Sequence, residues 1–226
     1  MNHAIIYEDE QLLIWNKPAG LATQTSNLRE PDLVSLVKNY GKGAYVALIN
    51  RLDQQVEGIV LFAKTPAVAK KLSKHMKEGK IHKTYLGLVV GNPKEKGTLT
   101  HYLYKERNGN HSIVVGPHHK EGKKASLSYE MCSVVEHPIP EGTTLVRIQL
   151  HTGRHHQIRV QFSAEHMPLI GDKKYGNEES LSISQGCAMK QIALSACELR
   201  LMHPVTNREI AVKIEPTWLT NWKLRR

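Results

Sequence analysis

The chain has 226 residues, of which 40% are hydrophobic and 23% charged, as in an ordinary globular protein. No stretch approaches the run of about 18 apolar residues that a membrane span needs. The acidic residues near the N-terminus disfavour a secretory signal. We therefore expect a cytoplasmic protein with no membrane partner. The odd number of cysteines, without a CxxC pair, predicts reduced thiols rather than a disulfide frame or a zinc site at Cys132, Cys187 and Cys197.

The charge balance is strongly basic. Lys and Arg total 31 against 21 Asp and Glu, a formal net charge of +10. A compact basic domain attracts polyanions, and the release of condensed counterions favours RNA or DNA. A basic protein with no nucleic-acid partner fits the charge alone equally well.

The first third of the chain alternates short strands with loops. Pro18 and Gly20 mark a loop over residues 17–25. Residues 31–41 predict a short helix, with Pro31 in its first turn and Gly41 at its stop. A polar loop is expected over residues 53–58. Apolar runs bounded by polar turns predict strands over residues 4–9, 11–17, 44–53 and 58–64.

The segment from Thr65 to Gly79 is the clearest helix. Thr65 fits the N-cap, Pro66 the first helical position and Gly79 the stop. Apolar residues recur every four positions on one face. The other face carries Lys70, Lys71, Lys74 and Lys77. This charged face is either a solvated surface or a contact for RNA phosphates, and the sequence leaves both open.

The remaining two thirds predict more strands than helices. One helix is expected over residues 155–166, after a turn at Thr152–Gly153, and residues 171–186 are expected to form a loop. Because strands follow one another directly, the chain predicts an α+β fold with a largely antiparallel sheet. The expected strands cover residues 82–91, 99–104, 111–116, 125–137, 143–151, 191–204 and 208–216.

Two places carry candidate chemistry. Asp53 stands where a strand gives way to a loop, preceded by Arg51, so it is either a catalytic carboxylate or a turn-forming residue bonded to nearby backbone amides. The segment 150–162 places Arg154 after a tight turn whose amides would point outward towards an anion. Arg159 lies four residues after His155, so we expect the two to share a helix face. Arg159 is then either held beside the core with its guanidinium reaching a partner, or an ordinary surface cation.

Five segments in register resemble the RluA-like family of pseudouridine synthases (large-ribosomal-RNA A-type). The resemblance runs from about Leu12 to about Pro216. It implies a pseudouridine synthase fold, with a curved mixed, mostly antiparallel sheet, flanking helices and a central RNA-binding cleft. It implies that no metal or organic cofactor is required. Many members of the family carry a small RNA-binding domain before the catalytic one, but here the matching loop starts at Asn16. We therefore expect a single catalytic domain over residues 1–226, without an N-terminal accessory domain, acting as a monomer. The segments are IWNKPAGL, INRLDQQVEGIVLFAKT, KTYLGLVVG, LHTGRHHQIRVQFSAEHMPLIGDKKYG and ALSACELRLMHPVT.

The resemblance also implies roles for single residues. Asp53 matches the catalytic aspartate, Tyr85 the active-site tyrosine and Arg159 the basic residue that pairs with the aspartate. Arg51 matches an arginine that holds RNA around the flipped nucleotide, and Lys17 belongs to a motif that lines the cleft.

We add Arg154 and His156 as candidate substrate-binding residues. The chain departs from the family in having Asn50 where His is usual, and Val56–Glu57 where Thr-Ser is usual. Because of these departures, the sequence does not decide which RNA is the substrate, and it does not exclude a catalytically inactive member of the family.

The predicted function is the isomerisation of specific uridines in ribosomal or transfer RNA. An ionised carboxylate can attack the sugar or the base, or stabilise positive charge on the sugar. We expect an Asp53 carboxylate oxygen within ~4 Å of an Arg159 guanidinium nitrogen. The first alternative is a catalytically inactive RNA-binding relative that acts in RNA folding or ribosome assembly. A hydrolase that releases free uracil and, more remotely, a metal enzyme are the others, although the adjacent histidine pairs 118–119 and 155–156 lack metal-ligand spacing.

Overall fold

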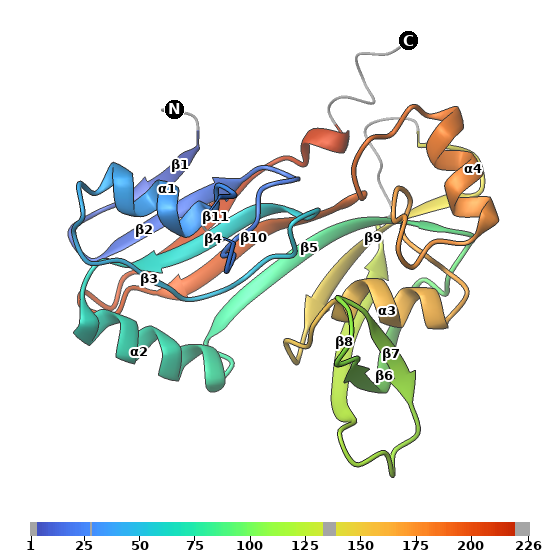
Figure 1. Ribbon diagram of the computed structural model, residues 1–226, viewed down its shortest axis with the longest axis horizontal. Coiled ribbons are helices and arrows are strands. Elements are labelled where there is room, and N and C mark those ends of the chain that lie inside the picture. Colours follow the sequence, from blue (N-terminus) through green and yellow to red (C-terminus); the bar gives the residue numbers. More distant parts are fainter. Residues whose placement is uncertain (1–3, 28, 133–138, 220–226) are drawn as a thin grey trace. The chain divides into compact units, whose positions relative to one another are not determined.

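The computed structural model describes residues 4–27, 29–132 and 139–219 (Figure 1). The chain divides into two compact units. Unit 1 comprises residues 1–83 and 195–216, and unit 2 comprises residues 84–194 and 217–226. Each unit is described by itself, and the single domain expected over residues 1–226 stays a prediction. In the part of the chain that the structure describes, no helix has both the length and the apolar character needed to cross a membrane.

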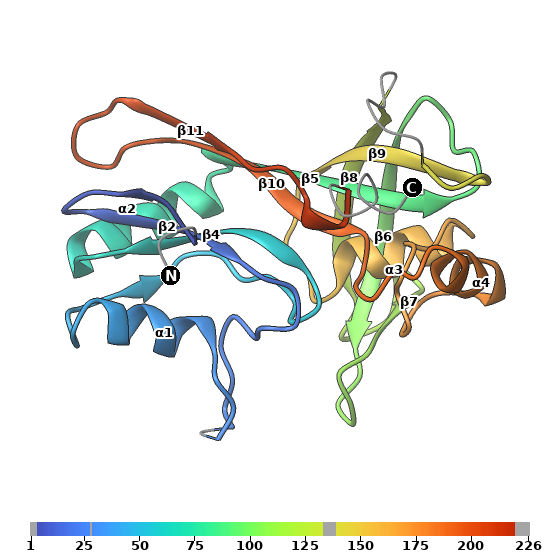
Figure 2. The same ribbon diagram turned by 90° about the horizontal axis from the view of Figure 1, so that it is seen from above.

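Unit 1 is built on a sheet of short strands. Their order is β1-β2-β4-β10, with β11 beside β10 and β3 beside β4. The β4–β10 pair is parallel and the other pairs are antiparallel, and Figure 2 shows the long β10–β11 hairpin. The strands are β1 (Ile5–Glu8), β2 (Leu12–Lys17), β3 (Ala47–Leu48), β4 (Glu57–Ala63), β10 (Leu194–Met202), which enters unit 1 at Ser195, and β11 (Glu209–Lys213).

Two helices belong to unit 1. The helix α1 (Leu33–Tyr40) is capped by Asp32, whose carboxylate accepts from the amide of Ser35 at 2.7 Å. Pro31 therefore precedes the cap, and its predicted place in the first turn is wrong. The helix α2 (Pro66–Lys77) begins at the predicted cap, Thr65. Its apolar face packs into the core of unit 1, which includes side chains of α2, β2, β4, β10 and β11.

The strand predicted over residues 44–53 is much shorter, because a side chain replaces the backbone pairing. The side-chain amide of Asn50 donates through Nδ2 to the carbonyl of Ile59 at 3.2 Å and accepts through Oδ1 from the N–H of Leu61 at 2.8 Å. Asn50 therefore ties the chain to β4 while its backbone turns away. Close packing between β4 and β10 requires Gly58, since a Cβ there would lie 2.5 Å from the carbonyl oxygen of Ala196.

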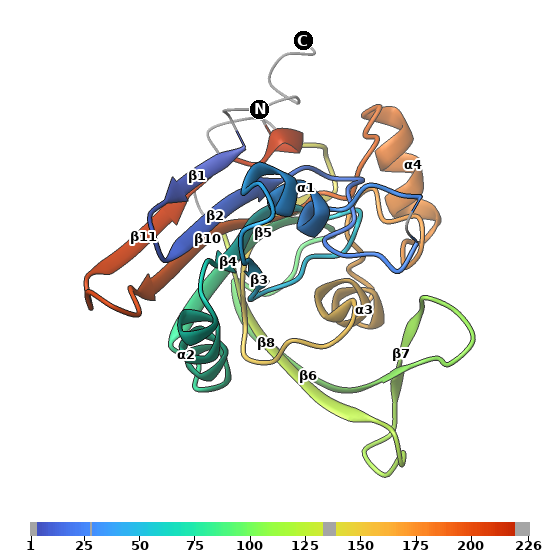
Figure 3. The same cartoon turned by 60° about the vertical axis from the view of Figure 1, so that its left-hand side comes forward.

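Unit 2 has an antiparallel sheet with the order β5-β9-β8-β6-β7. Figure 3 shows the helix α3 (Gln157–Ala164) beside the strands β6 and β7. The predicted strand 125–137 ends at Met131 within the described residues, and residues 133–137 lie outside them. The strands are β5 (Ile81–Val90), which enters unit 2 at Thr84, β6 (Lys96–Lys105), β7 (Ser112–Val115), β8 (Lys123–Met131) and β9 (Thr143–Leu150).

The loop predicted over residues 171–186 contains the helix α4 (Glu178–Gly186). Asn177 and Ser180 form a reciprocal capping box, with both bonds at 2.9 Å. Acidic residues at Glu178 and Glu179 favour the same helix end. This helix buries small polar residues rather than an apolar stripe, which is why its pattern was missed. The predicted α+β class with a largely antiparallel sheet is confirmed.

Candidate active site

Asp53 lies half-buried in the turn between β3 and β4, and hydrogen bonds hold the backbone on both sides of it. Before it, the buried hydroxyl of Thr23 donates to the carbonyl of Leu52 at 2.7 Å and accepts from its N–H at 3.1 Å. After it, the carbonyl of Gln54 accepts from the amide of Gly20 at 2.8 Å. The loop over residues 17–25 therefore fixes the backbone that carries Asp53.

Lys17 completes this support from inside unit 1. Its side chain is 0% exposed, and its ammonium donates to the carbonyls of Pro18 at 2.9 Å, Leu21 at 2.7 Å and Gln54 at 3.2 Å. These bonds use all three ammonium hydrogens. Lys17 was expected to line the cleft, but its ammonium lies buried, where three backbone carbonyls replace water as its hydrogen-bond partners.

Two carboxylates sit near this buried cation. Burial lowers the pKa of Lys17 to about 8, while the negative charges of Asp53 and Glu57 act to raise it. Glu57, one of the departures from the family pattern, is itself buried at the start of β4. The buried carboxylate of Glu57 is therefore close enough to the buried ammonium of Lys17 for the two charges to interact. Arg51, by contrast, is exposed, and its predicted contact with RNA stays a prediction.

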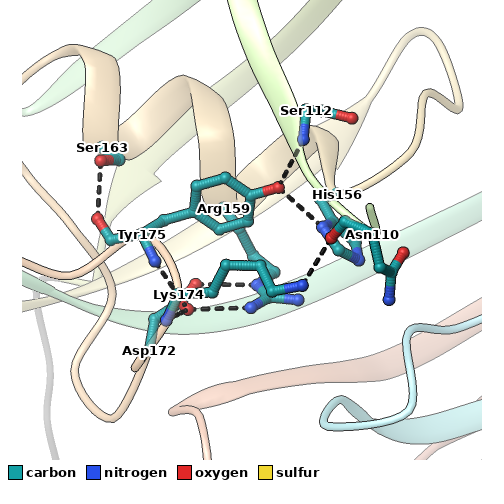
Figure 4. Close-up of polar contacts among 8 residues, drawn as sticks. All are labelled: Asn110, Ser112, His156, Arg159, Ser163, Asp172, Lys174 and Tyr175. Atoms are coloured by element: carbon teal, nitrogen blue, oxygen red, sulfur yellow. Dashed lines mark hydrogen bonds and ion pairs between the residues drawn. The ribbon is translucent and has the colours of Figure 1, made fainter. Parts of the chain in front are cut away.

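In unit 2, Arg159 lies in the first turn of α3 and is only 5% exposed. Its guanidinium binds the carboxylate of Asp172 side-on, through Nε at 2.7 Å and Nη2 at 2.8 Å (Figure 4). This bidentate geometry is the strongest form of an arginine–carboxylate pair. The prediction that Arg159 is held beside the core and reaches a partner is confirmed.

Asp172 was missed by the sequence reasoning. A buried arginine needs a counter-ion. Asp172 follows the apolar stretch 167–170 after a single glycine, Gly171, and this is the signal that could have identified it. The predicted contact between Arg159 and Asp53 stays a prediction, because Asp53 belongs to unit 1 and Arg159 to unit 2.

The aromatic ring of Tyr175 covers the guanidinium of Arg159, with Cζ 5.0 Å from the ring centroid. The hydroxyl of Tyr175 accepts from the amide of Ser112 at 2.8 Å and lies 2.8 Å from Nδ1 of His156. Burial, followed by the positive charge of Arg159, lowers the pKa of His156 to about 2, so this imidazole is neutral. His156, a predicted substrate-binding residue, is therefore buried and bonded to Tyr175.

The turn before α3 differs from its prediction. His156 adopts a left-handed conformation with φ 53°, so α3 begins only at Gln157. His155 precedes the helix, and the helix face that it was expected to share with Arg159 does not exist. The amide of Arg154, expected to point outward, donates to Oε1 of Gln157 at 3.0 Å. The exposed side chain of Arg154 donates to the carbonyl of Lys124 at 3.0 Å.

Tyr85 and the lysines of α2 complete the predicted set. Tyr85 lies on β5 opposite Ile148 and is only 5% exposed. Its stacking against a uracil stays a prediction. The lysines of α2 are exposed; one of them donates to the carbonyl of Pro204 and another lies 3.7 Å from Glu78. Both interpretations of this face therefore remain open.

Two solved structures share this fold. Human RNA pseudouridylate synthase domain containing 4 matches with a TM-score of 0.76 at 21% identity, over 99% of this chain and 93% of that one. Human RNA pseudouridylate synthase domain containing 1 matches with a TM-score of 0.75 at 21% identity, over 94% and 83%. At this identity the likeness defines the fold.

The sequence defines the family. The family model described as RNA pseudouridylate synthase matches residues 11–164. The tRNA pseudouridine synthase C of Vibrio parahaemolyticus is 31% identical, over 95% of this chain and 91% of the relative. The ribosomal large subunit pseudouridine synthase C of Rickettsia felis is 32% identical, over 96% and 69%. The chain belongs to the RNA pseudouridylate synthase family, whose members are isomerases.

Proposed function

We propose that this chain converts specific uridines in transfer or ribosomal RNA to pseudouridine, with Asp53 as its catalytic carboxylate. The observation that carries the assignment of Asp53 is the support of its loop. Thr23 holds the residue before Asp53, and Gly20 and Lys17 hold the residue after it. A carboxylate fixed in this way is arranged before the substrate arrives, as catalysis requires.

The reaction needs an ionised carboxylate. It breaks the N-glycosidic bond of uridine, turns the uracil and joins C5 of the base to C1′ of the sugar. Asp53 acts as nucleophile or stabilises the positive charge that develops on the sugar. The buried ammonium of Lys17 favours the ionised form, because the attraction that acts to raise the pKa of Lys17 also favours the carboxylate.

We propose that the guanidinium of Arg159 binds a second carboxylate in addition to that of Asp172. Asp172 occupies the Nε and Nη2 side of the guanidinium, and the Nη1 edge points away from that contact by the geometry of the group. A fork of this kind suits an oxyanion, and we propose Asp53 as that oxyanion. Tyr85 stacks on the uracil, and its hydroxyl accepts a proton in the later transfer.

RNA is the proposed partner. The net charge of +10 and the exposed side chains of Arg51 and Arg154 suit a phosphate backbone. The target base must leave its stack before it reaches a carboxylate, which favours loops or distorted RNA. We propose that the protein acts as a cytoplasmic monomer and uses no metal or organic cofactor.

Mapping of pseudouridine in all transfer and ribosomal RNA tests this function. RNA from cells with and without the protein is compared at single-nucleotide resolution, and re-expression of the wild-type chain is the control. We expect one or a few uridines to lose modification without the protein and to regain it on re-expression. Unchanged maps would favour the RNA-binding alternative, and release of free uracil from RNA in vitro would favour the hydrolase.

A further inference from the structure

We infer that Asp172 and Tyr175 are positioning residues for Arg159, and that Tyr175 links the position of Arg159 to the β6–β7 hairpin. This inference rests on the proposed role of Arg159 in catalysis. It concerns a network that lies wholly within unit 2 (Figure 4).

The first step is the way in which one short turn holds the guanidinium. Asp172 fixes the group in its own plane through two charged hydrogen bonds, and the ring of Tyr175 covers its face. A free arginine side chain has many rotamers of similar energy. The two contacts restrict its freedom before any RNA binds. Polar groups that need no rearrangement during the reaction are the most effective in catalysis.

The second step is the rigidity of the turn itself. Oδ1 of Asp172 also accepts from the amides of Lys174 at 3.0 Å and Tyr175 at 3.2 Å. The amide of Gly176 donates to the carbonyl of Asp172 at 2.8 Å, and a Cβ at Gly176 would lie 2.4 Å from that oxygen. Ser163 of α3 donates to the carbonyl of Tyr175 at 2.7 Å. The turn is therefore closed on itself and tied to the helix that carries Arg159.

The third step connects this turn to β7. The hydroxyl of Tyr175 accepts from the buried amide of Ser112, the first residue of β7. Lys174 donates to the carbonyl of Asn110, just before the strand. His155, which precedes α3, lies 2.8 Å from Oγ of Ser112 and 2.7 Å from Oδ1 of Asn110.

The start of β7 is thus held by the same turn that holds Arg159. Beyond β7 the chain carries exposed cations at Lys120, Lys123 and Lys124. RNA phosphates that bind this segment would shift or fix the start of β7. Because the Tyr175 hydroxyl is hydrogen-bonded there, the position of its ring over Arg159 would change with it. The guanidinium of Arg159 is then held most firmly when RNA is bound to this segment.

The test measures kcat and KM on the RNA target identified by mapping. Asp172→Asn should lower kcat by about 100-fold, the cost of a misplaced catalytic group, while KM for RNA stays within about twofold. Tyr175→Phe keeps the ring and removes the hydroxyl, so it should lower kcat by about tenfold and speed hydrogen exchange over residues 110–113. Tyr129→Phe is the matched control, because Tyr129 packs on Phe162 of the same helix, and its kcat should not change.

Two further variants separate positioning from folding. Asp172→Asn leaves a buried guanidinium without its counter-ion, so thermal unfolding is measured for every variant. Asp172→Glu keeps the charge but displaces it, and it should fold yet still lose kcat. Arg159→Lys should reduce kcat in the wild type but add little to Asp172→Asn, because both changes remove the same fork.

Each result supports or overturns the inference. Multiplicative losses in the Asp172 and Arg159 double variant would show that Asp172 acts elsewhere. Normal kcat in Tyr175→Phe, with faster exchange at residues 110–113, would remove the link to the hairpin. Active wild-type protein with unaffected variants overturns this inference alone, whereas wild-type protein that forms no pseudouridine overturns the proposed function.

Discussion

Replacing Thr23 by valine removes one hydroxyl from the support of Asp53 and changes little in shape. The hydroxyl makes two hydrogen bonds to Leu52, at 2.7 and 3.1 Å, inside the protein. Without it, one buried carbonyl and one buried N–H lose this partner. Each such group costs about 1–3 kcal/mol when left unsatisfied. Since water or small shifts recover part of that cost, we expect Thr23→Val to lower the free energy of unfolding by about 2–4 kcal/mol.

The same change should reduce activity beyond its effect on folding. Leu52 directly precedes Asp53, so a loosened backbone displaces the carboxylate, and we expect kcat to fall by about 10–100-fold. Urea unfolding measures the effect on stability. Single-turnover pseudouridine formation, under conditions well below the unfolding midpoint, measures the effect on activity. Thr25→Val is the control, because the hydroxyl of Thr25 accepts a solvent-exposed hydrogen bond from the amide of Asn27. Full activity in a folded Thr23→Val protein would refute the reasoning.

Three further predictions concern charge. The pKa of Lys17 is about 8 when folded and about 10.4 when unfolded, so the unfolded state binds more protons between these values. Between pH 7.5 and pH 10, the unfolding free energy of the wild type should therefore rise by about 2 kcal/mol relative to that of Lys17→Met. If urea titrations give the same difference between the two proteins at both pH values, this prediction is wrong. His156 has a depressed pKa of about 2, and its stabilisation is lost as pH falls below about 6.5. From pH 7.5 to pH 5 the wild type should lose about 2 kcal/mol more than His156→Gln, and parallel curves would contradict the burial of a neutral imidazole. Replacing Lys70, Lys71 and Lys74 together by glutamine should flatten the salt dependence of RNA binding if α2 contacts phosphates; an unaltered slope would make this face a solvated surface.

Local signals explain which elements could be predicted. The helix α2 has its cap, its first-turn proline and its apolar period within one short segment, so its bounds follow from the sequence. The helix α4 has a cap but no apolar stripe, so its sequence pattern predicts a loop. The strand before Asp53 failed for another reason. There the side chain of Asn50 takes over the pairing with β4, which no local pattern reveals.

The site shows the same division. Asp53, Tyr85 and Arg159 were selected by their resemblance to a family. Their supports were not, because each depends on contacts between segments far apart in the chain. Thr23 reaches Leu52 across the fold of unit 1, and Asp172 reaches Arg159 through a turn whose geometry the sequence does not display.

The central claim is that Asp53 performs the chemistry. Asp53→Asn keeps the size of the side chain but cannot supply a carboxylate. Because it also removes an attraction to the buried ammonium of Lys17, thermal unfolding is used to establish that the variant is folded. Pseudouridine is quantified in the target RNA after incubation with equal amounts of folded wild-type and variant protein. The account predicts stoichiometric conversion by the wild type and no detectable pseudouridine with Asp53→Asn. Near-normal conversion by the folded variant would contradict it.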